Sequence, residues 1–315
     1  MKDFERKQLQ AFFDTADEAG VTNREKIGQK QQIIRRLATT DKAKSYETAG
    51  AAAAEGEFSA GVVQVDDRLI GFGIHILNED IYPLQSFEIY LRGCDLTGSL
   101  DLSHCADLLF VDVYHNRISQ VHVADMPSLR ILGLQDNRIE ALDPTGLPAC
   151  QGIDVGKNCL KTLDVSQNRE LVELYVNDNQ LTQIDLSRNP KLKFVYCHNN
   201  GLIQLDTRAN PLLRHLNATG NPLKQIHTWA PQRETALPLS LTAEEGGCVG
   251  LRYNPVYNAQ WKETGQWQQA YYAYPEPGWR FRGWFDENGG LLSEEALWQD
   301  RYGESRCLTA RFQKE

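Results

Sequence analysis

The side chains most suited to chemistry are seven cysteines, some of them next to histidine. Cysteine and histidine adjoin at His104-Cys105 and at Cys197-His198, and both residue types are zinc ligands. The repeat register set out below places Cys105 and Cys197 in interior columns, which favours structural thiols over a metal site. The sequence contains no phosphate-binding loop, zinc-hydrolase helix, Gly-x-Ser-x-Gly elbow or EF-hand loop. We therefore expect no metal and no cofactor.

Cys159 occupies a different kind of position from the other repeat cysteines. Its column otherwise holds polar, glycine or proline residues, which indicates exposure. Arg138 falls one repeat earlier in that column, where its charge could favour a thiolate. An ordinary surface thiol is the simpler interpretation. The cysteines near the C-terminal end, Cys248 and Cys307, stand in no catalytic motif. An effector enzyme with a reactive cysteine is therefore kept only as an alternative.

Acidic residues also recur at a fixed spacing. The column comprises Asp101, Asp143, Asp164, Asp185 and Asp206, with His122 as its one interruption. Stacked carboxylates could bind calcium, but an aspartate can equally cap a turn by accepting a nearby backbone N–H. We expect turn capping here.

An asparagine recurs every twenty-one residues through the middle of the chain. Apolar residues accompany it five and three positions before and two positions after. The asparagines are Asn116, Asn137, Asn158, Asn179, Asn200 and Asn221, with Cys94 in the equivalent place one coil earlier. A fixed period of this kind predicts a solenoid in which each repeat forms one coil.

The asparagine column predicts a ladder of buried amides. Each coil contributes one short strand, and coils stacked about 4.8 Å apart pair these strands into a parallel sheet. A buried amide donates and accepts at once, so it can satisfy the backbone groups left by the turn after the strand. We expect Asn158 and Asn179 to be buried and bonded to backbone. A second column holds Asn168, Asn189 and Asn210, with Cys105, Met126 and Leu147 in earlier coils.

Together the columns follow the pattern L-x-x-L-x-L-x-x-N/C-x-L, so residues from about 84 to 230 resemble the leucine-rich repeats. The stretch LTQIDLSRNP at 181–190 is similar to the bacterial short-repeat subclass. The resemblance covers close to half of the chain. It implies an α+β repeat protein that binds a protein partner and catalyses nothing.

The segments before and after the repeats differ in composition. Residues 1–60 are predicted to form a helical N-terminal cap and linker, with helices over 3–38 and a capping box at Thr22-Asn23-Arg24-Glu25. Residues 61–232 form the predicted leucine-rich-repeat solenoid, with strand-like runs over 62–90 leading into its first coil. The remainder, residues 233–315, is the predicted β-rich C-terminal module.

Aromatic and Gly-Trp motifs characterise that C-terminal module. Residues 274–285 read YPEPGWRFRGWF, and a closing LTARF follows at 308–312. This order resembles the internalin-type B repeats of bacterial surface proteins, which are small β-grasp-like modules. The resemblance implies a second alternative function, a secreted or cell-surface adhesin whose partner would be a host or cell-surface protein. Here the module stands alone, without a tandem array.

Bulk properties restrict the partner and the compartment. The formal net charge of −9 argues against nucleic acid as the main partner. No stretch is long and apolar enough to insert into a membrane, and residues 1–6 do not resemble a secretory signal. An odd number of cysteines without compact spacing favours a cytoplasmic location, with secretion or the cell surface as the alternative.

Strand residues that alternate with the buried ones should face the concave side of the solenoid, where a partner would bind. Exposed aromatic residues at the centre of such a sheet are common anchors of protein recognition. The alternatives are that another segment covers them, or that they stabilise the sheet by stacking across strands. The predicted partner-binding residues are Tyr90, Arg92, Phe110, Asp112, Tyr114, Tyr175, Phe194, Tyr196 and His198.

Overall fold

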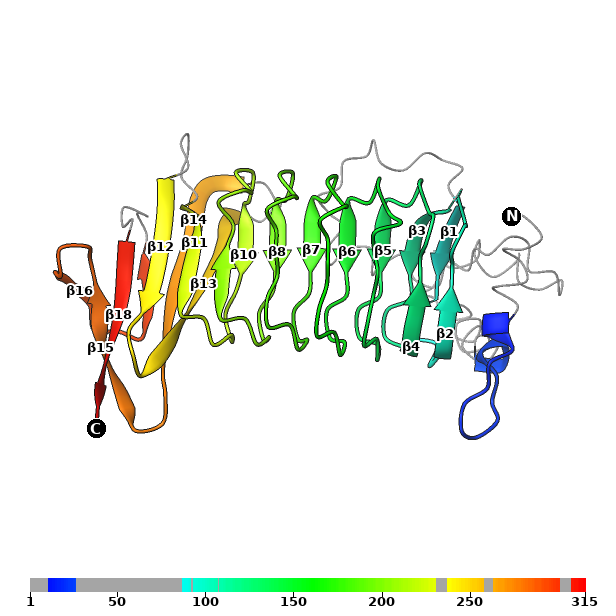
Figure 1. Cartoon of the computed structure of the whole chain (residues 1–315), viewed down its shortest axis with the longest axis horizontal. Coiled ribbons are helices and arrows are strands. Elements are labelled where there is room, and N and C mark those ends of the chain that lie inside the picture. The colour runs from blue at the N-terminus through cyan, green and yellow to red at the C-terminus, as the bar shows by residue number, and fades with distance from the viewer. Residues whose placement is uncertain are drawn as a thin grey trace, which may run out of the picture. The chain divides into compact units, whose positions relative to one another are not determined.

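The computed structural model describes residues 11–26, 87–91, 93–106, 108–230, 237–257, 263–300 and 307–315. Strands and turns form nearly all of this part of the chain, and the predicted solenoid of repeated coils is confirmed (Figure 1). The chain divides into two compact units, Met1–Cys150 and Gln151–Glu315. Coils of the same design build both units.

The first unit contains two small parallel sheets. Strands β1 (Phe87–Tyr90), β3 (Leu108–Asp112) and β5 (Ile131–Gly133) pair in that order. On the return side of the coils, β2 (Thr97–Asp101) pairs with β4 (Arg117–His122). The apolar columns lie between the two sides and are fully buried; among them are Leu96, Leu100, Val111, Ile118 and Leu132.

The predicted helical cap is not supported. Among the described residues of this region, only 11–13 and 23–26 are helical, which amounts to single turns. The rest of the predicted helices, and the strand-like run before residue 87, lie outside the described residues. The capping box is present: the Thr22 N–H donates to the Glu25 carboxylate (2.8 Å), and the Glu25 N–H donates to the Thr22 hydroxyl (3.2 Å).

Residues 11–26 nevertheless contact the first return strand through a buried amide. Asn23 Nδ2 donates to the carbonyls of Phe12 and Thr97, both at 2.9 Å, and Asn23 Oδ1 accepts the Thr97 N–H at 2.9 Å. Gly98 has a φ of +90°, and a Cβ there would lie 2.7 Å from Thr15 Cγ2. The close approach therefore depends on glycine.

The second unit begins with four parallel strands. These are β6 (Gly152–Asp154), β7 (Glu173–Tyr175), β8 (Phe194–Tyr196) and β10 (His215–Asn217). The sheet continues through β13 (Gly247–Tyr257), β14 (Glu263–Pro275) and β17 (Leu297–Asp300), which are antiparallel additions from the C-terminal module.

A second sheet starts on the return side of the same unit. Strand β9 (Gln204–Asp206) pairs with β11 (Gln225–Ala230), and β12 (Leu237–Ala243), β18 (Cys307–Lys314), β15 (Trp279–Phe285) and β16 (Leu291–Ser293) follow in order. The predicted β-rich character of the C-terminal segment is thus confirmed.

The C-terminal module covers the open edge of the last coil. Leu216, Leu223 and Ile226 would have no further coil beside them, yet each is at most 1% exposed. The Val249 N–H donates to the Leu223 carbonyl at 2.9 Å, and the Ala218 N–H donates to the Leu251 carbonyl at 2.9 Å. Both sheets of the coil stack therefore continue into the module, which leaves no bare repeat edge there.

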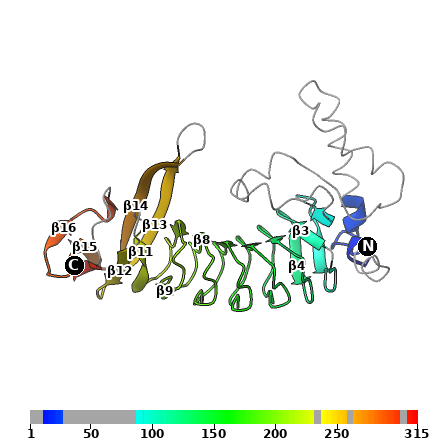
Figure 2. The same ribbon diagram turned by 90° about the horizontal axis from the view of Figure 1, so that it is seen from above.

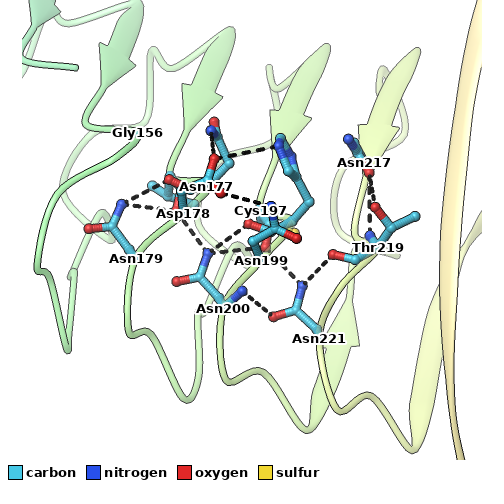
Figure 3. Close-up of polar contacts among 12 residues, drawn as sticks. Gly156, Asn177, Asp178, Asn179, Cys197, Asn199, Asn200, Asn217, Thr219 and Asn221 are labelled. Atoms are coloured by element: carbon cyan, nitrogen blue, oxygen red, sulfur yellow. Dashed lines mark hydrogen bonds and ion pairs between the residues drawn. The ribbon is translucent and has the colours of Figure 1, made fainter. Parts of the chain in front are cut away.

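The asparagine ladder forms as predicted (Figure 3). Asn179 Nδ2 donates to the Val155 carbonyl of the preceding coil (2.9 Å) and to the Val176 carbonyl of its own (3.2 Å). Its Oδ1 accepts the Leu160 N–H at 2.9 Å. Asn158 is buried as expected, whereas Asn179 is only partly buried. The same bonds recur at Asn116, Asn137, Asn200 and Asn221.

The second asparagine column is buried more completely but is bonded on one side only. Asn189 Nδ2 donates to the Val165 and Asn168 carbonyls, and Asn210 Nδ2 donates to the Leu186 and Asn189 carbonyls, all within 2.9 Å. The Oδ1 atoms of these amides have no hydrogen-bond partner. Because the Oδ1 acceptors of this column are not used, cysteine, methionine and leucine can occupy it in earlier coils.

The residue just before each ladder position adopts the left-handed conformation, which we did not predict. The column is Gly93, His115, Asp136, Lys157, Asp178, Asn199 and Gly220, with φ between 52° and 66°. Most of these are residue types that tolerate positive φ. At Gly220 a Cβ would lie 2.2 Å from Asn199 Oδ1, so a larger residue there would displace the Asn199 side chain.

The aspartate column caps turns, as predicted. In each case Oδ1 accepts the backbone N–H two residues later, at 2.8–3.0 Å, which is an Asx turn. The pKa of Asp143 is lowered by hydrogen bonds from the Thr145 side chain and then from its backbone N–H, and the pKa of Asp185 is lowered mainly by the bond from the Ser187 backbone N–H. At Asp206 the hydrogen bond from the Arg208 side chain is the main cause of a lowered pKa.

Candidate functional site

Outward-facing side chains on the parallel strands of the second unit form a surface that we call the strand face. The parallel register aligns them in three rows that cross β6, β7, β8 and β10. The first row is Gly152, Glu173, Phe194 and His215. The second is Asp154, Tyr175, Tyr196 and Asn217, and the third is Gly156, Asn177, His198 and Thr219.

Two stacked tyrosines occupy the middle of this surface. The rings of Tyr175 and Tyr196 are 5.1 Å apart with an interplanar angle of 21°. Both side chains are partly buried, so each also presents surface. Burial raises the pKa of both phenols, which therefore stay protonated at neutral pH.

Other coils use the tyrosine position for a structural purpose. Asp112 Oδ1 accepts the Tyr114 N–H (3.2 Å), Asp154 Oδ1 accepts the Gly156 N–H (3.1 Å), and Asn217 Oδ1 accepts the Thr219 N–H (3.3 Å). A tyrosine side chain lacks the short acceptor that makes this bond. The two tyrosines thus replace a local cap with a flat aromatic surface.

Beside the tyrosines, the first row is buried. Phe194 and His215 stack with their ring centroids 4.3 Å apart, and the residues are only 4% and 6% exposed. Burial lowers the pKa of His215 to about 4, and the nearby Arg214 charge acts in the same direction. The imidazole is therefore neutral at physiological pH.

Glu173 is the most unusual residue of the row. It is 3% exposed, and burial raises the pKa of its carboxyl to about 8. The Tyr175 hydroxyl lies 3.3 Å from Oε2, which slightly opposes that shift, and the negative charge of Asp154 adds to it. The carboxyl carries its proton at neutral pH, which sequence reasoning did not anticipate.

Polar side chains follow the tyrosines towards the ladder (Figure 3). Asn177 Nδ2 and Asn199 Nδ2 each donate to the Asp178 carboxylate at 2.7 Å. Burial raises the pKa of Asp178, but these hydrogen bonds outweigh it and hold the pKa below its usual value. His198 Nε2 lies 3.8 Å from Asp178 Oδ2, and burial lowers the pKa of His198.

A residue of the C-terminal module also belongs to the strand face. Arg252 on β13 pairs with Asn217, in the row that holds the tyrosines, and it is exposed. In Figure 2 the β13–β14 hairpin extends away from the coils that precede it. Alternation in the sequence could have revealed this residue, because Val249, Leu251 and Tyr253 are buried on the opposite side of β13.

The predicted binding residues differ in their exposure. Tyr114, Tyr175, Tyr196 and His198 are partly buried and retain surface. Phe110, Asp112 and Phe194 were expected to be exposed but are at most 4% exposed, so that expectation was wrong. The structure places Tyr90 on β1 without describing its side chain, and Arg92 lies outside the described residues.

In the first unit, the absence of a side chain at Gly133 determines where the ring of Tyr114 lies. A Cβ on Gly133 would fall 2.6 Å from Tyr114 Cε1, so the tyrosine ring rests on the glycine backbone.

In the second unit, Phe194 stacks on His215, a contact that the row alignment in the sequence could have indicated.

None of the seven cysteines, all of which are described, forms a disulfide, and Cys94, Cys105, Cys150 and Cys197 are buried. Burial raises the pKa of Cys197 to about 12 and also raises the pKa of Cys248, the opposite of what a nucleophilic thiolate requires. Cys159 is partly buried.

No group of three metal-ligating side chains occurs in the described part of the chain. No helix found there has the length and apolar character of a membrane span.

Comparison with known proteins gives structural likenesses only. No family model matches the chain, and no curated protein matches it. One similar structure is the functional domain of InlJ from Listeria monocytogenes, which includes a cysteine ladder, at 14% identity and a TM-score of 0.41. Another is the internalin InlF from the same organism, at 22% identity and a TM-score of 0.34.

Both alignments are partial. The first covers 71% of this chain and 60% of the InlJ domain, and the second covers 42% of each chain. The chain therefore spans less than two thirds of either structure.

Proposed function

We propose that the protein binds a protein partner on the strand face of the second unit and acts without catalysis. The observation that carries this proposal is the Tyr175–Tyr196 stack. Its two side chains keep surface in a row where other coils place a capping aspartate or asparagine. Rigid aromatic side chains lose little conformational entropy on binding and are enriched at the energetic centres of interfaces.

The surroundings of the stack support the same proposal. Polar groups flank the tyrosines, with Asn177, Asp178 and His198 on one side and Arg252 beyond Asn217. An aromatic centre with a polar rim is the usual composition of a non-obligate protein interface. In the row beside the tyrosines, Phe194 and His215 stack on each other.

We further infer that the C-terminal module is of the internalin B-repeat type and serves as the cap of the repeats. Its aromatic motif falls on β15 and β18, which pair antiparallel, and Trp284 of that motif is fully buried. The module takes part in binding through Arg252, so the binding surface is not limited to the repeats.

The experiment is a comparison of partner capture from a lysate of the source organism. The full chain is used as bait, against a variant carrying Tyr175→Ser and Tyr196→Ser. Capture of specific proteins should be lost in the double variant, because the flat aromatic surface is removed while Phe194 and the ladder are kept.

A matched control carries Ile203→Ser and Leu212→Ser. These are exposed apolar residues of the same unit, 58% and 50% exposed, outside the three rows. This variant should capture the same proteins as the unaltered chain. If the control loses capture and the tyrosine variant retains it, the binding surface lies elsewhere and the proposal fails.

A further inference from the structure

Glu173 carries a buried carboxyl oxygen that no residue in the described part of the chain satisfies. Oε1 is buried and has no hydrogen-bond partner, while Oε2 has only the long contact of 3.3 Å with the Tyr175 hydroxyl. In the described part of the chain, no lysine, arginine or histidine forms an ion pair with it. Buried polar groups are normally paired, so this one requires an explanation.

The fold does not require an acidic residue at the position of Glu173. Most of the equivalent residues in other coils have aromatic or apolar side chains and are buried, namely Phe110, Ile131, Phe194 and His215, while Gly152 holds this place on β6 and Glu88 holds it on β1. An apolar side chain therefore fills this site without difficulty. A buried acid that breaks the local pattern without a structural gain is characteristic of functional sites.

The surroundings of Glu173 are suited to a positive charge. Asp154 lies on β6 next to Tyr175, and Gly152, which pairs with Glu173, contributes no side chain. One face of the Tyr175 ring is stacked on Tyr196, so the other face is turned towards β6. A cation there would meet a carboxylate oxygen and an aromatic face together.

We propose that Glu173 receives a lysine or arginine side chain of the partner, which enters from the β6 side and packs against Tyr175. The inference rests on the proposed function and specifies the chemistry of the partner: a basic side chain at the centre of its contact surface. The ammonium or guanidinium group donates to Oε1, and the Tyr175 hydroxyl moves away from Oε2 to admit it.

Binding of this kind is coupled to proton release. The carboxyl is protonated at neutral pH because burial raises its pKa to about 8. A neighbouring cation favours the charged form, so its arrival expels the proton to solvent and leaves a carboxylate paired with the cation. The neighbouring titratable groups are Asp154 on β6, Tyr175 and Tyr196, and His215 on β10. Both tyrosines have raised pKa values, and the pKa of His215 is about 4, so none of these three changes charge near neutral pH.

The test is an NMR titration of the full chain with 13C-labelled glutamate. The probes are Nα-acetyl-lysine methylamide and Nα-acetyl-arginine methylamide, with Nα-acetyl-norleucine methylamide as an uncharged control of similar shape. At saturation, the cationic probes should lower the Glu173 titration midpoint by about one pH unit. The norleucine compound should leave it unchanged.

Two variants make the assignment specific. Glu173→Gln should abolish saturable binding of the cationic probes, as seen in the shifts of nearby Tyr175. Glu170→Gln is the control, because the Glu170 side chain is 41% exposed and pairs with Lys191 instead, and this variant should bind the probes like the unaltered chain. If the midpoint does not move, or if the Glu173→Gln variant binds the probes equally well, the inference is overturned. The proposed function would still stand in that case, provided that the double tyrosine variant loses partner capture.

Discussion

At the scale of single residues, the strand face holds two titratable groups whose pKa values are shifted for the same reason and with opposite effects. Burial disfavours charge on both Glu173 and His215, so the acid stays protonated and the base stays neutral. Each of them makes the stability of the fold depend on pH in a different range.

Glu173→Gln should stabilise the protein above neutral pH. The folded-state pKa of about 8 is above the unfolded value near 4.5. Below pH 4.5 the carboxyl is neutral in both states, so the contribution of Glu173 to stability is fully present. This contribution is lost as the pH rises through 8, because the buried carboxyl then becomes charged. Glutamine stays neutral and removes this loss, so chemical denaturation at pH 8.5 should show a higher free energy of unfolding than for the unaltered chain. At pH 4 the two should agree closely. A variant that is equally destabilised at both pH values would contradict the raised pKa.

His215→Phe should reduce the acid sensitivity of the fold. The folded-state pKa of about 4 is below the unfolded value near 6.5, so the stability associated with neutral His215 is present above pH 6.5. It is lost as pH falls through 4. Phenylalanine keeps the stack on Phe194 and cannot take up a proton. Thermal unfolding at pH 7 and pH 4 should show a smaller drop in Tm for the variant. An equal drop in Tm for the variant and the unaltered chain would contradict the lowered pKa of His215.

At the scale of the coil, most structure follows from local sequence. The ladder bonds of Asn179 and the Asx turn at Asp185 use atoms of the same or the adjacent coil, so a fixed spacing was enough to predict them. Left-handed φ at Asp178 and Asn199 was predictable for the same reason, from a column rich in glycine, asparagine and aspartate.

The sequence alone could not predict that some of the outward-facing residues are buried. Alternation along a strand assigned Phe194 and Glu173 to the outside correctly. Their burial depends on neighbours in other strands, such as the ring of His215 stacked on Phe194. The arrival of Arg252 from β13 depends on a strand pairing between residues far apart in sequence. The repeat pattern of the sequence gives no indication of such a contact.

Asn179→Ala should destabilise the protein by about 1–3 kcal/mol, because the change strands the Leu160 N–H and the Val155 carbonyl. Denaturant unfolding measures this difference. Asn189→Leu provides the comparison within the second column, where Oδ1 is unpaired and leucine occurs naturally at position 147. It should cost less than Asn179→Ala. Equal or reversed costs would show that the first column is not the principal ladder.

At the scale of the whole molecule, the C-terminal module covers the edge of the last coil. Leu216, Leu223 and Ile226 are buried because β13 and β12 continue the two sheets beyond the last coil. Removing the module would expose both this apolar edge and the unpaired backbone of β10 and β11.

Truncation after residue 232 should therefore give a protein that aggregates or melts at a lower temperature. Size-exclusion chromatography with light scattering, together with thermal unfolding, measures both outcomes. A variant that keeps the module but carries Lys224→Ala loses only the Lys224–Glu276 ion pair and the bond to the Gly247 carbonyl, so it should remain monomeric. A soluble, monomeric truncation with unchanged Tm would show that the module is an independent domain.

The ladder also determines which changes in length a gene for this protein tolerates. The amides of Asn179 and Asn200 each bond to their own coil and to the one before it. Loss or duplication of twenty-one codons inside the second unit therefore rejoins the same partners, and the products differ only in the number of coils. A change of any other length moves each later asparagine away from the carbonyls that it serves. Unequal recombination between neighbouring repeats can therefore lengthen or shorten the binding surface during evolution. Single-codon insertions in the strands cannot do this, because they break the spacing of the ladder.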